Sequence, residues 1–263
     1  MGGYYYDRIF NEYNESRVGG RVTVGRQLNK YWTASTSLRI ENVGVNDVSY
    51  FAPPEIRSVI GSNFLVGVSA GVTRDTRDSY LRATEGSLLD IRFEQVFGEF
   101  TYPLVNVDFN KYWTIYQRAD GSGRHVLAMH NQVALAGAQT PVYDAYYAGG
   151  FRSMRGFEFR GISPENPLYP GFKIGGDFML LNSLEYQLPV LANDHLFLVA
   201  FVDSGTVERS IELRNYRVSA GVGVRFVVPM LGPVPIALDF GFPIVKSDQD
   251  REQIFSFRVG FFH

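Results

Sequence analysis

Three arginines, Arg152, Arg155 and Arg160, lie among aromatic and glycine residues in one short stretch, residues 146–161. A guanidinium is always charged, and its planar fork of donors suits a carboxylate bound through two parallel hydrogen bonds. The stretch belongs to a longer segment, residues 138–174, that shows no sustained apolar alternation. Disordered segments are poor in aromatic residues, so we expect this segment to be an ordered loop. A cationic, aromatic loop of this kind needs a polar cavity to enter.

The other residue types give no pattern for catalysis or metal binding. The four histidines have no spacing typical of metal ligands, and the chain contains no cysteine. No arrangement of serine, histidine and aspartate can be read from the sequence. We therefore expect no catalytic residue, no metal, no cofactor and no enzymatic activity. The net charge of -2 gives no reason to expect nucleic acid as a partner, because that would call for a basic patch.

Almost everything on either side of the loop alternates apolar with polar or glycine residues, as strands do. The clearest case is residues 217–226, where Val218, Ala220 and Val222 alternate with Arg217, Ser219 and Gly221. Turn residues separate such stretches. We expect an all-β fold of about twelve strands, near residues 4–13, 17–28, 31–43, 58–73, 87–97, 105–110, 127–135, 178–187, 196–203, 218–226, 236–242 and 255–261.

Two fold classes alternate in this way, the soluble β-sandwich and the transmembrane β-barrel. The polar face here carries arginine, aspartate, glutamate and glycine, as a crowded polar lumen would, and aromatic residues lie near strand ends on the apolar face. No run of 18 apolar residues occurs, so no transmembrane helix is expected. The sequence favours a transmembrane antiparallel β-barrel of about 12 strands, and patterning alone leaves the soluble fold open.

The chain contains the motifs Met154-Arg155-Gly156-Phe157 and Phe201-Val202-Asp203-Ser204-Gly205. They resemble the Val-Arg-Gly-Phe and Phe-x-Asp-x-Gly signatures of the BamA-like outer-membrane protein-assembly factors. Thr73 to Asp78 looks like the Asp-Thr-Arg-Asp turn of the family, and Gly221 to Arg225 and Gly232-Pro233 match the strand and turn near the end. The resemblance covers roughly residues 60–263.

The resemblance implies that the segment near residues 138–174 is an extracellular loop folded into the lumen of an outer-membrane barrel. It implies non-enzymatic folding and insertion of outer-membrane proteins, with the lipid bilayer, unfolded client proteins and accessory assembly subunits as partners. A polypeptide-exporting barrel of the related secretion class is the first alternative, and a passive or structural barrel is the second. The implied location is the outer membrane of a Gram-negative-type envelope rather than that of an organelle.

Arg155 is expected to bind an inward carboxylate, because an unpaired charge away from bulk water is costly. Asp203 is the first candidate and Glu185 the second, since alternation turns both inward on neighbouring strands. Phe201 and Gly205, from the motif around Asp203, are expected to help to anchor the loop. The alternative is that Arg155 is a solvated loop arginine and Asp203 an ordinary lumen charge.

The last strand resembles the C-terminal signal of outer-membrane barrels, which alternates aromatics and usually ends in one. Its candidate residues are Phe255, Phe257, Val259, Phe261 and Phe262, and His263 after them departs from the pattern. These residues also fit simple lipid-facing positions, and both interpretations can hold together.

The chain departs from the family in size. The family barrel has sixteen strands and periplasmic repeat domains before it, whereas here about seven strands precede the loop and no repeat domain is expected. We expect residues 1–263 to form a single transmembrane barrel domain, either a C-terminal piece or a shortened barrel. The first strand has no clean apolar face, so we expect the terminal strands to pair over fewer residues than any other neighbours.

Overall fold

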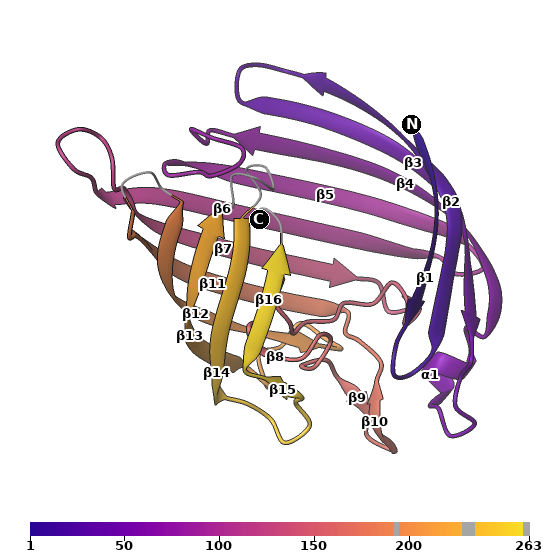
Figure 1. Ribbon diagram of the computed structural model, residues 1–263. Coiled ribbons are helices and arrows are strands. Elements are labelled where there is room, and N and C mark those ends of the chain that lie inside the picture. Colours follow the sequence, from indigo (N-terminus) through magenta and orange to yellow (C-terminus); the bar gives the residue numbers. More distant parts are fainter. Residues whose placement is uncertain (192–194, 228–234, 260–263) are drawn as a thin grey trace.

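The computed structural model describes residues 1–191, 195–227 and 235–259. Twelve strands form one antiparallel sheet in the order β1-β2-β3-β4-β5-β6-β7-β11-β12-β13-β14-β16, curved around a lumen (Figure 1). Their bounds are β1 Gly2–Ile9, β2 Asn14–Gln27, β3 Trp32–Asn46, β4 Gly61–Asp75, β5 Gly86–Gly98, β6 Tyr102–Tyr116, β7 His125–Ala136, β11 Phe178–Pro189, β12 Leu196–Glu208, β13 Arg217–Val227, β14 Pro235–Val245 and β16 Phe255–Val259. The expected all-β fold with about twelve antiparallel strands is confirmed.

The remaining elements lie in the connections. They are a short helix and four short strands: α1 Pro54–Arg57, β8 Gly156–Phe157, β9 Glu165–Asn166, β10 Tyr169–Lys173 and β15 Glu252–Gln253. The sequence analysis missed α1, because four residues are too few to show helical periodicity. In the described part of the chain, no helix is long and apolar enough to cross a membrane.

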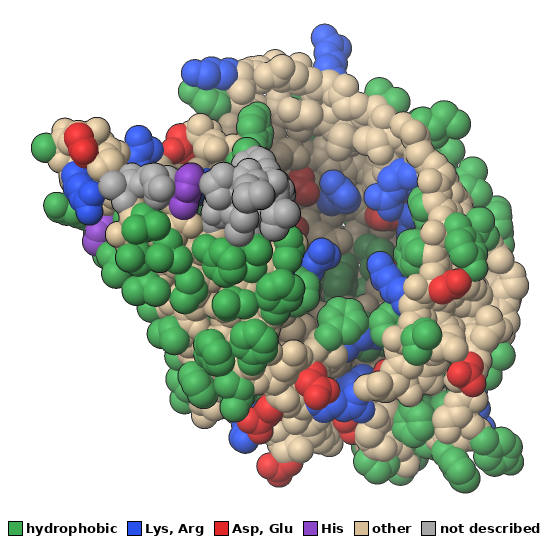
Figure 2. All heavy atoms as spheres, viewed as in Figure 1, with side chains coloured by type: hydrophobic (Ala, Val, Ile, Leu, Met, Phe, Trp, Pro, Cys, Tyr) green, Lys and Arg blue, Asp and Glu red, His purple; other side chains and the backbone are tan. Residues whose placement is uncertain are grey.

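The two faces of the sheet differ as the alternation predicted. Large apolar side chains on the outer face are exposed, and Val222 and Phe242, for example, keep 57% and 51% of their surface. Figure 2 shows apolar side chains gathered on the outside and charged side chains inside the hollow. In water so much exposed apolar surface would be unfavourable, so the outer face requires lipid.

The segment between β7 and β11, residues 137–177, lies inside the curved sheet and is called the lumen loop below. Its sequence shows no sustained apolar alternation, yet it contains the short strands β8, β9 and β10. Two apolar clusters hold it. Its base, with Val142, Tyr143 and Ile174, packs against β3 to β6, and its tip, with Met154 and Phe157, packs against β7, β11 and β12. Loop and sheet therefore share their buried apolar contacts.

β1 and β16 are the two edges of the sheet. β16 pairs with β14 through only five residues, Phe255 to Val259, and no ladder joins β16 to β1 within the ranges that the structure describes. The expected pairing of the terminal strands is thus not seen among the described residues and stays a prediction, because residues 260–263 of the last strand lie outside them. In the connection before β16, β15 pairs with β8 of the lumen loop. The opening between β1 and β16 is called the seam below.

Candidate functional site

The tip of the lumen loop is held by Arg155, which is 8% exposed. Its Nε and Nη2 donate to the two carboxylate oxygens of Asp203, at 2.8 and 2.7 Å, and its backbone N–H donates to Asp203 Oδ2 at 3.0 Å. Its Nη1 donates to Glu185 Oε2 at 2.6 Å. Asp203 thus binds both the side chain and the backbone of Arg155, which fixes the position and direction of the loop tip.

Neighbouring side chains complete this contact. Ser183 accepts from Arg155 and donates to Asp203 Oδ1 at 2.6 Å, and Ser219 donates to the Arg155 carbonyl at 2.6 Å. The guanidinium carbon lies 3.4 Å from the centre of the Phe201 ring, a cation–π contact. Burial disfavours the charged guanidinium, but the two carboxylates outweigh it and raise the pKa of Arg155 above its ordinary value.

The residues beside Arg155 fit the loop tip onto the sheet. Met154 and Phe157 are fully buried. Gly156 has a φ of 94°, a conformation that favours glycine. A Cβ at Gly156 would come within 3.2 Å of the backbone of Gly241 on β14, and one at Gly241 would come within 2.7 Å of the Gly156 nitrogen. Two glycines therefore let the loop backbone rest directly on the sheet.

The base of the loop has a second anchor, Asp144, whose side chain is 9% exposed. Arg17 on β2 donates to Asp144 Oδ1 at 2.7 Å and to the Tyr143 carbonyl at 2.8 Å, and Tyr102 on β6 donates to Asp144 Oδ2 at 2.6 Å. Arg39 Nη2 lies 3.6 Å from the same carboxylate. Burial opposes ionisation, but the two arginines outweigh it and hold the pKa of Asp144 below its ordinary value of 3.8.

A third set of contacts lies at the seam, around Arg160. Its guanidinium carbon lies 3.3 Å from the ring centre of Tyr147 and 4.1 Å from that of Phe10, and its Nη2 donates to the Tyr13 hydroxyl at 3.3 Å. Phe10 and Tyr13 belong to the turn between β1 and β2. Arg160 therefore ties the loop to the first edge of the sheet.

The same part of the loop binds the connection that leads to β16. Glu158 donates its N–H to the Arg251 carbonyl at 2.8 Å, and Lys173 Nζ donates to the Gln249 carbonyl at 2.8 Å. The Arg251 guanidinium also lies 3.7 Å from the carboxylate of Glu12 in the β1–β2 turn. These contacts among residues 10–13, 156–161, 173 and 249–253 are called the clasp. They hold the two edges together at the end of the seam where β1 stops and β16 begins.

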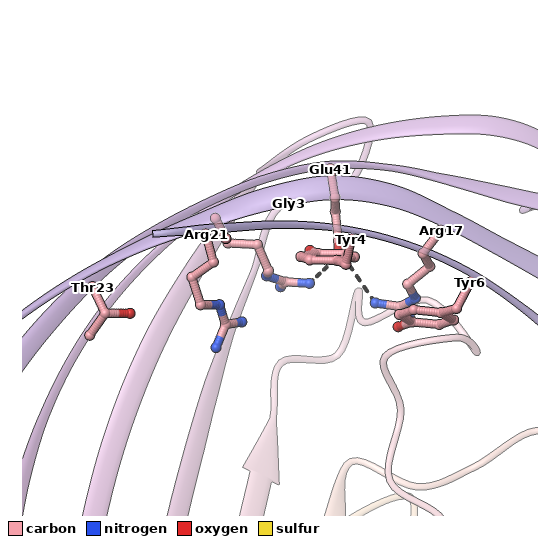
Figure 3. Close-up of a pocket in the computed structure, with 9 residues that line it drawn as sticks. Gly3, Tyr4, Tyr6, Arg17, Arg21, Thr23 and Glu41 are labelled. Atoms are coloured by element: carbon pink, nitrogen blue, oxygen red, sulfur yellow. Dashed lines mark hydrogen bonds and ion pairs between the residues drawn. The ribbon is translucent and has the colours of Figure 1, made fainter.

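At the other end of the seam, where β1 begins, the inner face of the sheet is hollowed. A cavity of about 500 Å³ is lined by residues of β1, β2 and β3 alone: Gly2, Gly3, Tyr4, Tyr6, Arg17, Arg21, Thr23, Arg39 and Glu41. Figure 3 shows their side chains on the concave side of the sheet. The seam is thus clasped at one end, and the cavity lies toward its other end.

The structure brings together most of the residues that the sequence singled out. Met154 to Phe157, Asp203, Glu185 and Phe201 meet at the loop tip. Gly205 does not meet them, because its α-carbon packs against the backbone and side chain of β11 at Leu180 and Leu181. Phe255, Phe257 and Val259 are exposed on the outer face, whereas Phe261 and Phe262 lie outside the described residues.

Sequence reasoning missed the anchors formed by Asp144 and Arg160 and the carboxylates around Arg17 and Arg39. The alternation in the sequence turns Ser183, Ser219 and Arg225 inward, but it does not show which of them meet the loop. No sequence signal identifies a contact between Arg160 and Phe10, which are 150 positions apart. In the described ranges, no group of three histidine, aspartate or glutamate residues is placed to hold a metal.

Comparison with known proteins shows the family to which the chain belongs. The sequence matches the Omp85 superfamily domain over residues 4–262. The chain belongs to the Omp85 superfamily. Its sequence is 28% identical over 274 residues to the outer membrane protein assembly factor BamA of Nitratidesulfovibrio vulgaris, an alignment that covers 98% of this chain and 33% of the relative.

Two solved structures share the fold of this Omp85 chain. BamA from Haemophilus ducreyi, lacking POTRA domains 1–3, matches with a TM-score of 0.80 at 20% identity, over 96% of this chain and 56% of that one. CdiB from Acinetobacter baumannii matches with a TM-score of 0.67 at 15% identity, over 95% of this chain and 42% of that one. The chain spans about a third of the length of the curated relative. Family and fold together place it in the outer membrane of a Gram-negative-type envelope.

Proposed function

We propose that this chain is the barrel part of an outer-membrane protein-assembly factor, which folds and inserts client barrels by pairing their strands at the seam. The observation that carries the proposal is that, among the described residues, β1 and β16 lie at the two ends of the strand order and no ladder joins them. An unpaired backbone group in hydrocarbon costs several kcal/mol. A client strand that adds to an edge would remove that cost and gain its own ladder of hydrogen bonds.

The clasp supports this role because it keeps the two edges near each other at the end of the seam where β1 stops and β16 begins. Among the described residues, β1 pairs with β2 in a regular register over residues 2–9. In the proposal, the other side of β1 offers its backbone donors and acceptors to a client strand. The process is non-covalent strand exchange, so the proposal includes no catalytic residue.

In this proposal the loop tip braces the barrel during strand exchange. Arg155 is bound to β11 and β12 through Glu185 and Asp203, while Asp144 binds β2 and β6. The loop therefore connects strands on both sides of the lumen. If these contacts hold, the sheet keeps its curvature when the seam is filled by a client strand. We also propose that Phe255, Phe257 and Val259 help to direct the chain to the outer membrane.

The proposal treats residues 1–263 as one barrel domain with the lumen loop near residues 138–174. The name of the N. vulgaris relative supports the assembly role, and client proteins and accessory subunits belong to the proposal. Export of a polypeptide through the lumen is the second candidate. The likeness to CdiB and the cavity on the inner face of β1 favour it.

Reconstitution in lipid vesicles tests these functions. An assembly factor should speed the folding of a urea-denatured client barrel added to the vesicles. An exporter should instead move an unfolded polypeptide into the vesicle interior, and a passive barrel should do neither and give steady ionic conductance. Client folding no faster than in empty vesicles would contradict the assembly function.

A further inference from the structure

The apolar outer face of the sheet gives way to polar side chains on three neighbouring strands, β4, β5 and β6. Val68 on β4 and Phe93 on β5 mark that face, since each is 46% exposed. Side chains on the same face of a strand follow at every second residue. Near the rim that carries the β4–β5 turn, the outward positions are therefore Arg74 on β4, Ser87 on β5 and Lys111, the β6 partner of Ser87.

Two cations of this row converge on one small residue, Ser87. Arg74 Nη1 donates to Ser87 Oγ at 3.5 Å. Lys111 is paired directly with Ser87, which puts the two Cβ atoms about 5 Å apart. Ser87 is buried beneath its neighbours, so the two cations lie over it on the lipid-facing side.

The chain supplies no counter-charge for these cations. Within the described ranges, neither Arg74 nor Lys111 forms an ion pair. Asp75 follows Arg74 in sequence, but its side chain turns to the other face and binds Arg77. Like charges on neighbouring strands repel each other. An anion from outside the chain, placed between Arg74 and Lys111, would remove this repulsion.

The two tryptophans of the chain give the depth of the cations. Trp32 on β3 is paired with Arg74, and Trp113 lies two residues beyond Lys111 on the same face of β6. The Lys111 ammonium lies 5.7 Å from the centre of the Trp113 ring. Figure 1 shows β3 to β6 side by side in the sheet. Because tryptophan collects where hydrocarbon meets lipid headgroups, Arg74 and Lys111 lie at headgroup depth.

We propose that Arg74 and Lys111 bind the phosphate of an anionic phospholipid whose acyl chains lie along the outer face of β4 to β6. The proposal is independent of the assembly function and of strand pairing. A lipid suits the site better than a soluble anion, because the outward apolar side chains of Leu89 and Phe109 continue directly from the two cations. An ammonium-bearing headgroup would bring a third positive charge to the site, so phosphatidylglycerol should bind better than phosphatidylcholine.

Tryptophan fluorescence makes this preference measurable. In Trp32→Phe, Trp113 is the one remaining tryptophan, and a lipid with brominated chains quenches it on contact. The full chain is placed in phosphatidylcholine vesicles that contain brominated phosphatidylglycerol or, as the reference, brominated phosphatidylcholine. A cation at an anionic membrane surface strengthens binding about fivefold. Because two cations share one phosphate, we expect phosphatidylglycerol to bind beside Trp113 about tenfold more tightly than phosphatidylcholine.

Variants show whether the two cations are responsible. Arg74→Gln and Lys111→Gln should each lower the preference to about threefold, and the double variant should abolish it. Lys111→Arg keeps the charge and should keep the preference. Arg26→Gln removes an exposed cation near the same rim, but on β2, four strands away from Trp113, and should leave the preference unchanged. Quenching by brominated phosphatidylcholine shows that each variant is inserted in the bilayer.

A distant reporter shows whether the preference is local. Phe240 lies on the outer face of β14 and is 46% exposed. Phe240→Trp, in a chain whose two native tryptophans are replaced by phenylalanine, should report no preference between the two lipids.

Four results would overturn the proposal. Equal binding of the two lipids beside Trp113 would show that the cations do not select an anionic headgroup. A preference that survives the double replacement of Arg74 and Lys111 would assign it to other residues. The same preference at Phe240→Trp would show a general attraction of anionic lipid to the chain. Displacement of the lipid by inorganic phosphate, but not by sodium chloride of equal ionic strength, would assign the cations to a soluble anion.

Discussion

Replacing Arg155 with alanine should release the tip of the lumen loop and leave the strands in place. Asp203 and Glu185 are 2% and 6% exposed, so the substitution leaves two buried carboxylates without their main partner. Removing one member of a buried ion pair destabilises by about 3–5 kcal/mol. Arg225 remains 3.4 Å from Glu185, which favours the lower end of this range. We expect the loop tip to lose about 3 kcal/mol, which corresponds to about a hundredfold more frequent opening.

Hydrogen exchange followed by mass spectrometry measures this opening directly. In Arg155→Ala, amides of residues 150–161 should exchange about a hundredfold faster than in the unaltered chain, while β12 and β13 keep their protection. Arg155→Lys keeps the charge but loses the two-pronged contact, and should fall between the two. Arg152→Ala removes an exposed arginine three positions away and serves as the control. Unchanged exchange in Arg155→Ala, or equal loss of protection in β12, would refute this reasoning.

The remaining predictions concern the other anchors and the outer face. Arg160→Ala removes the cation–π contacts to Phe10 and Tyr147, so exchange in the β1–β2 turn should rise about thirtyfold, for a desolvated contact worth about 2 kcal/mol; an unchanged turn would contradict the clasp. Because the pKa of Asp144 is lowered on folding, its contribution is present above pH 3.8 and is lost as the pH falls further. Pepsin should therefore cut residues 138–146 faster as the pH drops from 4 to 2. In Asp144→Asn, pepsin should cut the same residues fast already at pH 4. The exposed apolar outer face should make the chain monodisperse only with detergent or lipid, and a folded, monodisperse protein in plain buffer would contradict its assignment.

The strands could be predicted because each has one face in lipid and one in the lumen. The residue types of Val222 and Ser219, for example, show which face of the sheet each side chain occupies. An alternation with a period of two can be recognised without knowing the contacts of distant residues. The exact ends of the strands were harder to predict from the sequence. β6 extends to Tyr116, well past the expected end near residue 110, because Lys111, Tyr112 and Trp113 continue the ladder although they do not continue a clear alternation.

Only part of the candidate site could be predicted from the sequence. The alternation that turns Asp203 toward the lumen, together with the motif around it, predicted its contact with Arg155. Asp144 and Arg160 gave no such signal, because the contacts that they make depend on how a 41-residue loop folds inside the sheet. The pairing of β15 with β8 of the lumen loop could not be foreseen either, because two residues are too few to show an alternation.

Site-specific cross-linking during client folding tests the central claim most directly. The chain has no cysteine, so single cysteines can be introduced at Tyr5 on β1, Phe257 on β16 and Val107 in the middle of the sheet on β6. A client barrel with a cysteine in one strand is then folded in vesicles that contain each variant. Strand capture at the seam predicts disulfides to Tyr5→Cys and Phe257→Cys and none to Val107→Cys. Equal cross-linking at all three positions, or none at the seam while the client folds, would contradict it.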